Sequence, residues 1–465
     1  MGKYKNLLNN TIIFAIGNIS TRLIWFILLP LYTFYLSTSE VGIIDLIITT
    51  TNLLIPIFSL CIYDAALRLI IDSEKDSNKI ICSSLFVVLV SGIVSIILYP
   101  LLKFTVIESS YHIYFFLSFL LQMINNLFLN ITRATNKIKL FAVNSFLTAV
   151  TMLILAIIFL QYFSMGIEGY FLSIIGSTFL SILTLFVVGK FYRAIRFENV
   201  DKTVIRLMIL FSLPLIPNAT MWWITQFLDR YMITFFLGVE ANGIYAIANK
   251  IPNLIMIANL IFFQAWQLSA IQESQSEKKA TFFTNVFSVL FSVLILSTSG
   301  VLLILRPLMS LLVSEEFIVS WRFAPFLIVS VIFSSFSTFL GTNYLAMNKT
   351  TGVLKTSVAG AMMNIILNIL LIPRFGINGA SFSTMISVFL IWILRIVDTK
   401  RFVIIKINFF QFIISFILIF LQIGSLYFNS TFTILFGLFF LVLLVFLQIP
   451  TYMILYNLIN RSSRN

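Results

Sequence analysis

Residues 11–36, TIIFAIGNISTRLIWFILLPLYTFYL, decide the fold class of this chain. The run is largely apolar and long enough to cross the hydrocarbon core of a bilayer, which takes about 20 residues in a helix. It lacks the small-residue cleavage pattern of a signal peptide, so we expect it to stay as a helix. Helices satisfy all their backbone hydrogen bonds within one segment in lipid. The stretch therefore predicts a membrane-spanning helix.

Runs of the same kind recur along the chain. Of its 465 residues, 60% are hydrophobic and only 10% are charged, whereas an ordinary soluble domain carries roughly 25% charged residues. This composition excludes a soluble fold, and it excludes disorder, which requires low hydrophobicity and high charge. We predict an all-α polytopic membrane protein with about 14 transmembrane helices, at residues 11–36, 41–64, 80–102, 112–132, 140–162, 168–189, 208–236, 242–270, 281–305, 323–346, 353–372, 377–397, 408–428 and 432–457.

The positive charges indicate the orientation in the membrane. The formal net charge is +13, and most of the 30 Lys and Arg residues, Arg395 among them, lie in alternate connections. By the positive-inside rule, both termini face the cytoplasm. We attribute the excess charge to topology and to contact with anionic membrane lipids, and we expect no binding of nucleic acid. One histidine, His112, and two cysteines form no ligand set for a metal, so no metal site or cofactor is expected.

An internal repeat divides the chain. Residues 33–36 and 42–43 (TFYL and GI) recur 201 positions later at 234–237 and 243–244 (TFFL and GI), and residues 166–169 (GIEG) recur at 376–379 (GING). We expect two six-helix lobes, residues 1–206 and 207–400, related by a pseudo-two-fold axis along the membrane normal. Residues 401–465 would add two transmembrane helices and a short cytoplasmic tail.

Several polar side chains lie within the predicted helices, where ionisable groups are costly and usually face a cavity or a partner. We predict that they line one water-filled cleft shared by both halves, with Arg22, Arg68, Arg230 and Lys250 as its cations. Polar residues at helical spacing would line the same cleft: Asn18, Trp25, Thr49, Asn52, Asn218, Trp222, Gln226, Asn249 and Asn253.

Plainer interpretations of these residues stay open. Asn and Thr often hold transmembrane helices together, and Arg68 could belong only to the positive-inside signal. Asp229 and Arg230 are sequence neighbours, so we expect their side chains to point apart and each to find a partner on another helix.

Several stretches of the chain resemble a known family. The run LPLIPN at 213–218, the pair Trp222-Trp223, Asp229-Arg230 and the run GIYA at 243–246 resemble the seventh and eighth helices of Wzx-type polysaccharide repeat-unit flippases. These flippases belong to the multidrug/oligosaccharidyl-lipid/polysaccharide exporter superfamily. The run DAALR at 64–68 is similar to the end of the family's second helix, although Tyr63 stands where a small residue is expected. Residues 364–380 are similar to its eleventh-to-twelfth helix junction.

This resemblance implies a function. Members have a V-shaped pair of lobes and move undecaprenyl-pyrophosphate-linked oligosaccharides from the inner to the outer leaflet of the bacterial cytoplasmic membrane, for capsule, O-antigen or related surface polysaccharides. A polysaccharide polymerase and a chain-length regulator would be partners. Transport would be driven by the membrane potential or by proton or sodium exchange, and the acids available for an ion site are Asp45, Asp64 and Asp229.

Other functions remain open from the sequence. A lipid II flippase is a close neighbour, and a multidrug cation antiporter is a more distant one in the same superfamily. A membrane-embedded polysaccharide polymerase belongs to a different class and is disfavoured, because the predicted outer loops are short. We expect no enzymatic activity: the chain has no Walker loop and no carboxylate-rich soluble domain.

Overall fold

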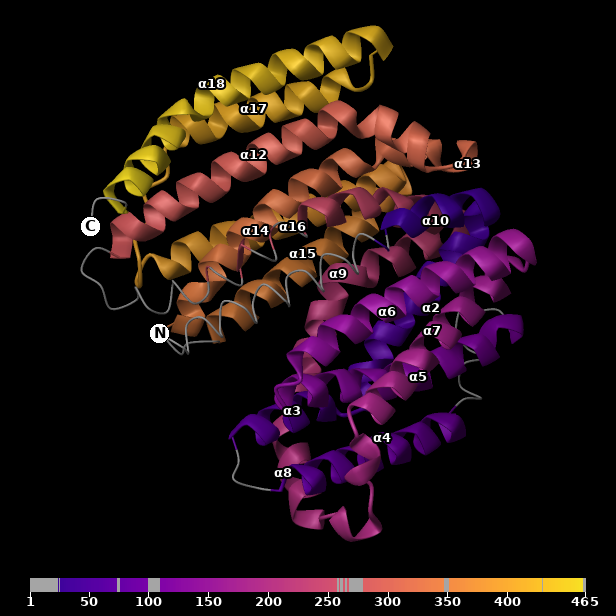
Figure 1. Ribbon diagram of the computed structural model, residues 1–465. Helices are drawn as coiled ribbons and strands as arrows, with labels where there is room; N and C mark the ends of the chain where they lie inside the picture. Colours follow the sequence, from indigo (N-terminus) through magenta and orange to yellow (C-terminus); the bar gives the residue numbers. More distant parts are fainter. Residues whose placement is uncertain are drawn as a thin grey trace. The chain divides into compact units, whose positions relative to one another are not determined.

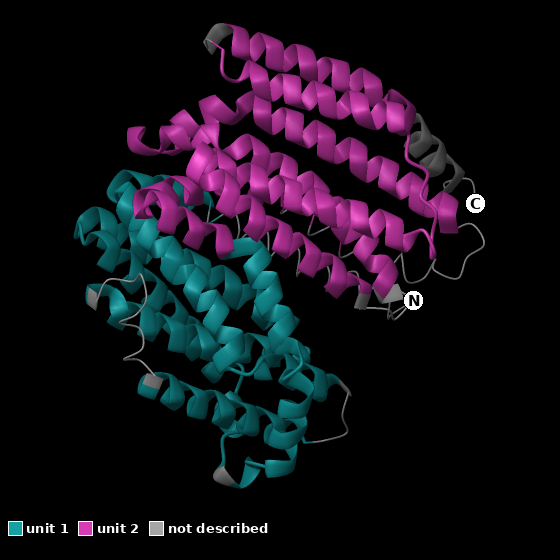
Figure 2. Cartoon of the chain, turned by 180° about the vertical axis from the view of Figure 1, so that it is seen from behind, with its two compact units in different colours: residues 1–227 teal, residues 228–465 magenta. Residues whose placement is uncertain are grey.

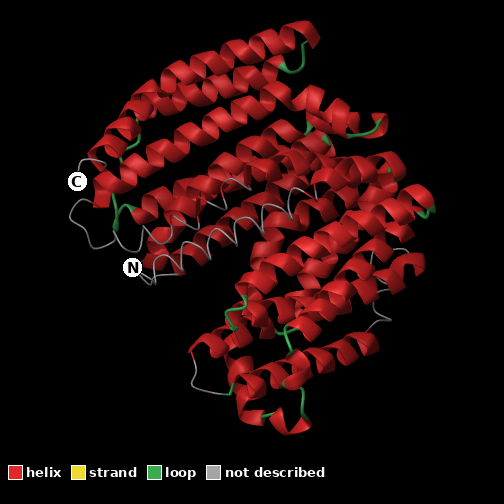
Figure 3. Ribbon diagram, in the orientation of Figure 1, coloured by secondary structure: helices red, strands yellow, loops and turns green. Residues whose placement is uncertain are grey.

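A computed structural model gives the fold of residues 24, 26–72, 76–98, 109–256, 259, 262, 263, 266, 279–346, 351–428 and 430–462. Every regular element in these ranges is helical, without any strand (Figure 3). Apolar runs of this length leave no other way to pair the backbone in lipid. The prediction of an all-helical polytopic membrane protein is therefore confirmed.

The chain forms two compact units, residues 1–227 and 228–465 (Figure 2). The boundaries at residues 206 and 400 that the repeat suggests stay a prediction. The main helices of the first unit are α2 (Thr38–Phe58), α3 (Ile62–Asp72), α4 (Ser77–Leu98), α5 (His112–Ala134), α6 (Ile138–Ala156), α7 (Gly166–Val188) and α8 (Lys202–Ser212). Helix α9 (Leu215–Leu237) begins in the first unit and ends in the second.

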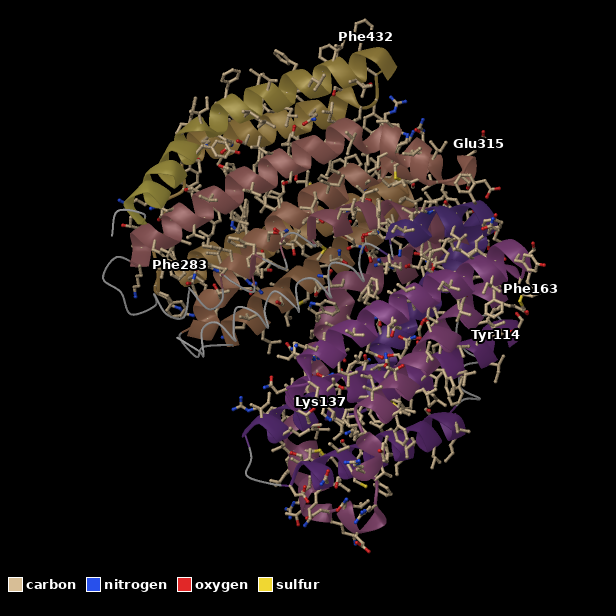
Figure 4. All side chains as sticks on the ribbon, viewed as in Figure 1. Tyr114, Lys137, Phe163, Phe283, Glu315 and Phe432 are labelled. Atoms are coloured by element: carbon tan, nitrogen blue, oxygen red, sulfur yellow. The ribbon has the colours of Figure 1, made fainter. Side chains whose placement is uncertain are left out.

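The second unit contains α10 (Val239–Ala248), α12 (Lys279–Leu312), the short α13 (Glu315–Ile318), α14 (Ala324–Ala346), α15 (Thr351–Phe375), α16 (Ile377–Thr399), α17 (Phe409–Ser425) and α18 (Ser430–Ser462) (Figure 1). A π-helical segment, Ile157–Tyr162, continues α6. Single 3-10 turns lie at Ser109–Tyr111, Phe191–Arg193, Phe197–Asn199 and Val319–Arg322. Lys137 lies at the turn from α5 to α6 (Figure 4), where its ammonium donates to the carbonyl oxygen of Gly189 over 2.6 Å.

Ten helices among the described residues are long and apolar enough to cross a membrane, and α8 with α9, bent by 41°, makes an eleventh. Shorter apolar helices cover Phe26–Tyr35 and α17. Each of the predicted spans overlaps a described helix, but the total of about 14 stays a prediction.

The predicted span at 41–64 is broken. Helix α2 ends at Phe58, and the backbone at Leu60 and Cys61 has φ of 52° and 51°. Left-handed backbone of this kind ends an α-helix. The chain then resumes as α3, which carries Asp64 and Arg68 on a separate short helix.

The repeat predicted from the sequence has a structural counterpart in each unit. Helices α2 and α10 begin at Thr38 and Val239, which are 201 positions apart. Helices α7 and α16 begin at the repeated glycine motifs, where Gly166 and Gly376 have φ of 56° and 60°. Only glycine adopts this conformation at little cost. The same turn therefore starts the last repeat helix of both units.

Aliphatic and aromatic side chains together fill the cores of both units. In the first unit, Leu127 and Met208 pack in one cluster with the rings of Phe119 and Phe128. The second unit stacks aromatic rings: the ring centroids of Phe333 and Phe416 are 5.0 Å apart, and those of Trp392 and Phe412 are 5.2 Å apart. Offset aromatic pairs add about 0.5–1.5 kcal/mol beyond their buried area.

The last two helices, α17 and α18, lie beside α12 (Figure 1). Ser299 donates to Gln422 over 2.8 Å, and the Gln422 amide returns a bond of 3.0 Å to the carbonyl oxygen of Ser299. Earlier on α12, Ser292 donates to Gln448 of α18 over 2.6 Å. Both glutamines are fully buried. Hydrogen bonds between side chains thus hold α17 and α18 to the second unit.

Candidate functional site

A buried carboxylate in the second unit is held by polar side chains from other helices. Asp229 of α9 is 5% exposed. The fully buried Tyr245 hydroxyl of α10 donates to its Oδ2 atom, and Thr384 Oγ1 of α16 lies 3.3 Å from the same oxygen. Four helices, α9, α10, α15 and α16, supply the side chains that meet here.

The guanidinium of Arg230 lies beside this carboxylate. Its Nη1 atom is 3.5 Å from Asp229 Oδ1, and its Cζ atom lies 5.9 Å from the ring centroid of Tyr245. The expectation that Asp229 and Arg230 point apart is therefore wrong, because the long arginine side chain folds back toward its neighbour. The expectation of a partner on another helix is correct for Asp229, since Tyr245 binds it.

Two asparagines extend the network away from the carboxylate. Asn364 Nδ2 is 3.5 Å from Thr384 Oγ1, and Asn368 donates to Asn364 Oδ1 over 3.0 Å. Asn368 is fully buried, and its own Oδ1 atom receives no hydrogen bond from the residues that the structure describes. We call these six residues the Asp229 network: Asp229, Arg230, Tyr245, Asn364, Asn368 and Thr384.

Four members of this network are not among the site residues predicted from the sequence: Tyr245, Asn364, Asn368 and Thr384. Asn364 and Asn368 are separated by four positions on α15, a spacing that places both on one face of a helix. Tyr245 directly follows the repeated GI motif at 243–244. Thr384 gave no distinct signal in the sequence, because it lies among several serines of α16 and hydroxyl side chains often hold transmembrane helices together.

The other candidate acids lie in the first unit. Asp45 on α2 and Asp64 on α3 are both half-buried. Asp64 interacts electrostatically with Arg133 of α5. Among the residues that the structure describes, no cluster of three or more His, Cys, Asp or Glu side chains is suited to bind a metal.

The polar residues predicted to line a cleft have varied surroundings. Asn18, Arg22 and Trp25 lie outside the described residues. Arg68, Asn52, Asn218, Trp222, Lys250 and Asn253 are exposed, and Gln226 and Asn249 are half-buried.

Thr49 packs instead inside the first unit. It is 1% exposed, and its hydroxyl donates to the carbonyl oxygen of Asp45 over 2.8 Å. Its own carbonyl oxygen accepts a bond of 2.7 Å from the indole of Trp223. In this structure Thr49 holds α2 to the first half of α9.

Arg395 is buried within α16. From the sequence, it was expected among the cations of a connecting loop. It donates to the carbonyl oxygen of Ser337 over 2.7 Å and to the hydroxyls of Thr356 and Ser357 over 3.1 and 3.2 Å. These bonds join α14, α15 and α16. The topology assignment of this one arginine is therefore corrected: it is a packing residue of the second unit.

The chain is similar to proteins of a known family. The family model described as "Polysaccharide biosynthesis protein" matches residues 7–267. An uncharacterised membrane protein of Methanocaldococcus jannaschii is 27% identical over 189 residues, which are 37% of this chain and 35% of that protein. The "probable low-salt glycan biosynthesis flippase" of Haloferax volcanii is 26% identical over 191 residues, 40% of each chain. The chain thus spans about two fifths or less of the length of these curated relatives.

Solved structures share the fold over a longer range. The lipid II flippase MurJ in an inward closed conformation superposes with a TM-score of 0.69 at 15% identity, over 98% of this chain and 100% of that chain. An inward-facing multidrug resistance MATE family transporter of the MOP superfamily gives a TM-score of 0.68 at 13% identity, over 83% of this chain and 93% of that chain. At these identities the likeness concerns the fold alone.

Proposed function

The chain belongs to the polysaccharide biosynthesis protein family, and from this membership we propose that it is a flippase for lipid-linked oligosaccharides. It would move undecaprenyl-pyrophosphate-linked units from the inner to the outer leaflet of a bacterial cytoplasmic membrane, with both termini in the cytoplasm. The product would enter capsule, O-antigen or related polysaccharide synthesis, together with a polymerase and a chain-length regulator. The family match carries this proposal, and the flippase of Haloferax volcanii supports it.

Alternating access between two lobes would carry the substrate. The repeated helix starts at Gly166 and Gly376 support a duplicated architecture of this kind. Arg22, Arg68, Arg230 and Lys250 would attract the pyrophosphate, because guanidinium and ammonium groups bind phosphate oxygens through charge-assisted hydrogen bonds.

The Asp229 network would couple transport to an ion. A proton or a sodium ion bound at Asp229 would compete with the guanidinium of Arg230, which lies 3.5 Å from the carboxylate. Thr384 Oγ1 lies beside Asp229 and offers a neutral oxygen for a sodium ion, and hard cations prefer oxygen ligands. Uptake of the ion would free Arg230 to bind the anionic substrate.

The multidrug antiporter remains the second candidate. The multidrug structures share the fold, but the superposition leaves about one sixth of this chain unmatched, whereas the lipid II flippase matches 98% of it. The wider coverage of this chain by the lipid II flippase therefore favours a flippase over an antiporter.

One experiment tests the substrate. Lipids are extracted from a strain that lacks the gene, and carrier-linked sugars are measured by mass spectrometry after leaflet-specific labelling. We expect complete lipid-linked units to accumulate on the inner leaflet. If units reach the outer leaflet at the normal rate, the flippase function is wrong; if the strain gains only drug sensitivity, the antiporter replaces it.

A second experiment tests the coupling site. The Asp229→Asn variant is reconstituted in proteoliposomes, and flipping is measured against pH and sodium gradients. We expect the response to the gradient to be lost. Asp398→Asn is the matched control in the same unit, because Asp398 binds Tyr344 and Arg401 near the end of α16. An unchanged gradient response in Asp229→Asn would rule out the proposed coupling site.

A further inference from the structure

An apolar groove of about 530 Å³ opens on the first unit. The residues of the Asp229 network belong to the second unit and do not line it. The end of α2 lines it with Ile57 and Phe58, α4 with Val90 and Val94, and α8 with Ile205 and Ile209. Among the described residues that line it, Ser91 carries the one polar side chain. The volume falls within the range of small-molecule sites, about 300–1,000 Å³.

The groove exists because two of its walls are interrupted helices. Helix α2 ends at the left-handed residues Leu60 and Cys61, and α8 bends by 41° into α9. Straight helices would close together along their whole length, with interaxial distances of about 8–10 Å. The interruptions leave α4 without a continuous neighbour on this side, and Phe86, Val90 and Val94 are each about 40% exposed.

An apolar groove at membrane depth does not by itself select its occupant. Lipid tails are as apolar as leucine, so an alkyl chain gains little hydrophobic free energy by leaving the bilayer for the groove. Selectivity has to come from polar groups at the mouth.

Two cations of α8 lie on the same helix face as the residues that line the groove. Lys202, Ile205, Arg206 and Ile209 follow one another at helical spacing and share one face of α8, and both isoleucines line the groove. The two cations are exposed and lie within about 10 Å of Ile209 along the helix axis. They lie at the start of the bent span, where we expect the groove to meet the headgroup region.

Asp201, the acid next to Lys202 in the sequence, is engaged by other groups. Asp201 accepts bonds of 2.8 and 3.4 Å from the backbone amides of Thr203 and Val204 at the start of α8, and it pairs with Lys79 over 3.7 Å. These amide bonds lower the pKa of the Asp201 carboxyl, so it stays ionised and engaged. An anion is thus left to Lys202 and Arg206.

We propose that this groove binds one acyl chain of an anionic glycerophospholipid, whose phosphate is held by Lys202 and Arg206. Phe86 and Val94 are eight residues apart, about 12 Å along α4, which suits a large part of one acyl chain but only a small part of a long polyprenyl chain. The proposal does not depend on the transported substrate, because it concerns a resident lipid of the first unit.

Native mass spectrometry of the full chain tests the proposal. The protein is released from nanodiscs that contain equal amounts of phosphatidylglycerol and phosphatidylcholine, and the retained lipid is identified. We expect one phosphatidylglycerol per chain. Lys202→Gln and Arg206→Gln should each weaken its retention about fivefold, the equivalent of about 1 kcal/mol per cation, whereas Lys139→Gln, at an exposed cation on α6, should not.

A second pair of variants tests the groove itself. Val90→Trp fills the groove and should abolish retention, while Leu89→Trp, at a position that is 50% exposed and does not line the groove, should leave it unchanged. Equal retention of the two phospholipids, or retention that survives both Val90→Trp and the charge variants, would overturn the proposal. Displacement of the lipid by added undecaprenyl phosphate would also overturn it, by assigning the groove to the polyprenyl carrier.

Discussion

The close approach of α16 to α15 at Gly379 gives a prediction with a defined magnitude. A Cβ atom at Gly379 would lie 2.4 Å from the carbonyl oxygen of Leu371 and 2.6 Å from its carbonyl carbon. Ordinary van der Waals contact begins at 3.4 Å, so the two backbones would have to separate by about 1 Å. Neither neighbour is a flexible side chain that could move aside. Gly379→Ala should therefore strain the helix pair.

The net cost follows from two opposing effects. Overpacking of this kind costs about 1–3 kcal/mol, and alanine regains about 0.5–1 kcal/mol over glycine inside a helix. We expect Gly379→Ala to lower the free energy of unfolding by about 1–2 kcal/mol. Gly300→Ala on α12, where nothing lies within 4 Å of the added Cβ, should be neutral or slightly stabilising.

The assay is unfolding by SDS titration in mixed micelles, followed by tryptophan fluorescence. Gly169→Ala, the repeat counterpart in the first unit, should fall between the other two variants, because its Cβ would meet Phe159 and Met165 at 3.0–3.1 Å. If Gly379→Ala unfolds at the wild-type midpoint, or if Gly300→Ala is the least stable of the three, the close packing of α15 and α16 is not what the glycine provides.

Three further predictions concern stability and use the same titration. A double-mutant cycle of Ser299→Ala and Gln422→Leu should give a coupling of about 0.6 kcal/mol, the average for such bonds in membranes, because the cycle isolates the bond from the Ser299 hydroxyl to Gln422 while the backbone carbonyl oxygen of Ser299 stays in place; a coupling near zero would mean that this bond does not hold α17. Arg395→Lys should cost more than Arg395→Met, by about 1–3 kcal/mol, because lysine keeps a buried charge but loses the guanidinium bonds to α14 and α15; the reverse order would contradict this. The stability that ionised Asp201 adds should be complete above its unfolded pKa of about 3.9 and be lost as the pH falls through its lower folded pKa. Asp201→Asn should therefore abolish that part of the pH dependence. An unchanged pH profile of stability would mean that the carboxylate of Asp201 does not stabilise the start of α8.

The sequence predicted the elements of this fold better than their contacts. Apolar runs of about 20 residues mark helices because lipid leaves few alternatives. The break at residues 59–61 was missed, since α2 and α3 form one continuous apolar run and the left-handed turn falls on Leu60 and Cys61 rather than on glycine.

The site was predictable only in part, for a related reason. Asp229 stood out as a carboxylate at membrane depth. Its partners Tyr245 and Thr384 come from helices distant in the chain, and helical spacing within one segment says nothing about which segments meet. Arg395 was assigned to a loop because its neighbours in sequence are cations, yet its contacts are decided by the packing of three helices.

The attachment of α17 to α12 has a consequence for biosynthesis. Ser299 and Gln422 are separated by 123 residues, and ribosomes add about 5–20 residues per second. Helix α12 therefore enters the bilayer about 6–25 s before its amide partner has been made. Over that interval the Ser299 hydroxyl has to bond within its own helix or to the insertion machinery. A nascent chain stalled before Phe409 would leave this face of α12 open, and it would be a substrate for membrane quality-control proteases.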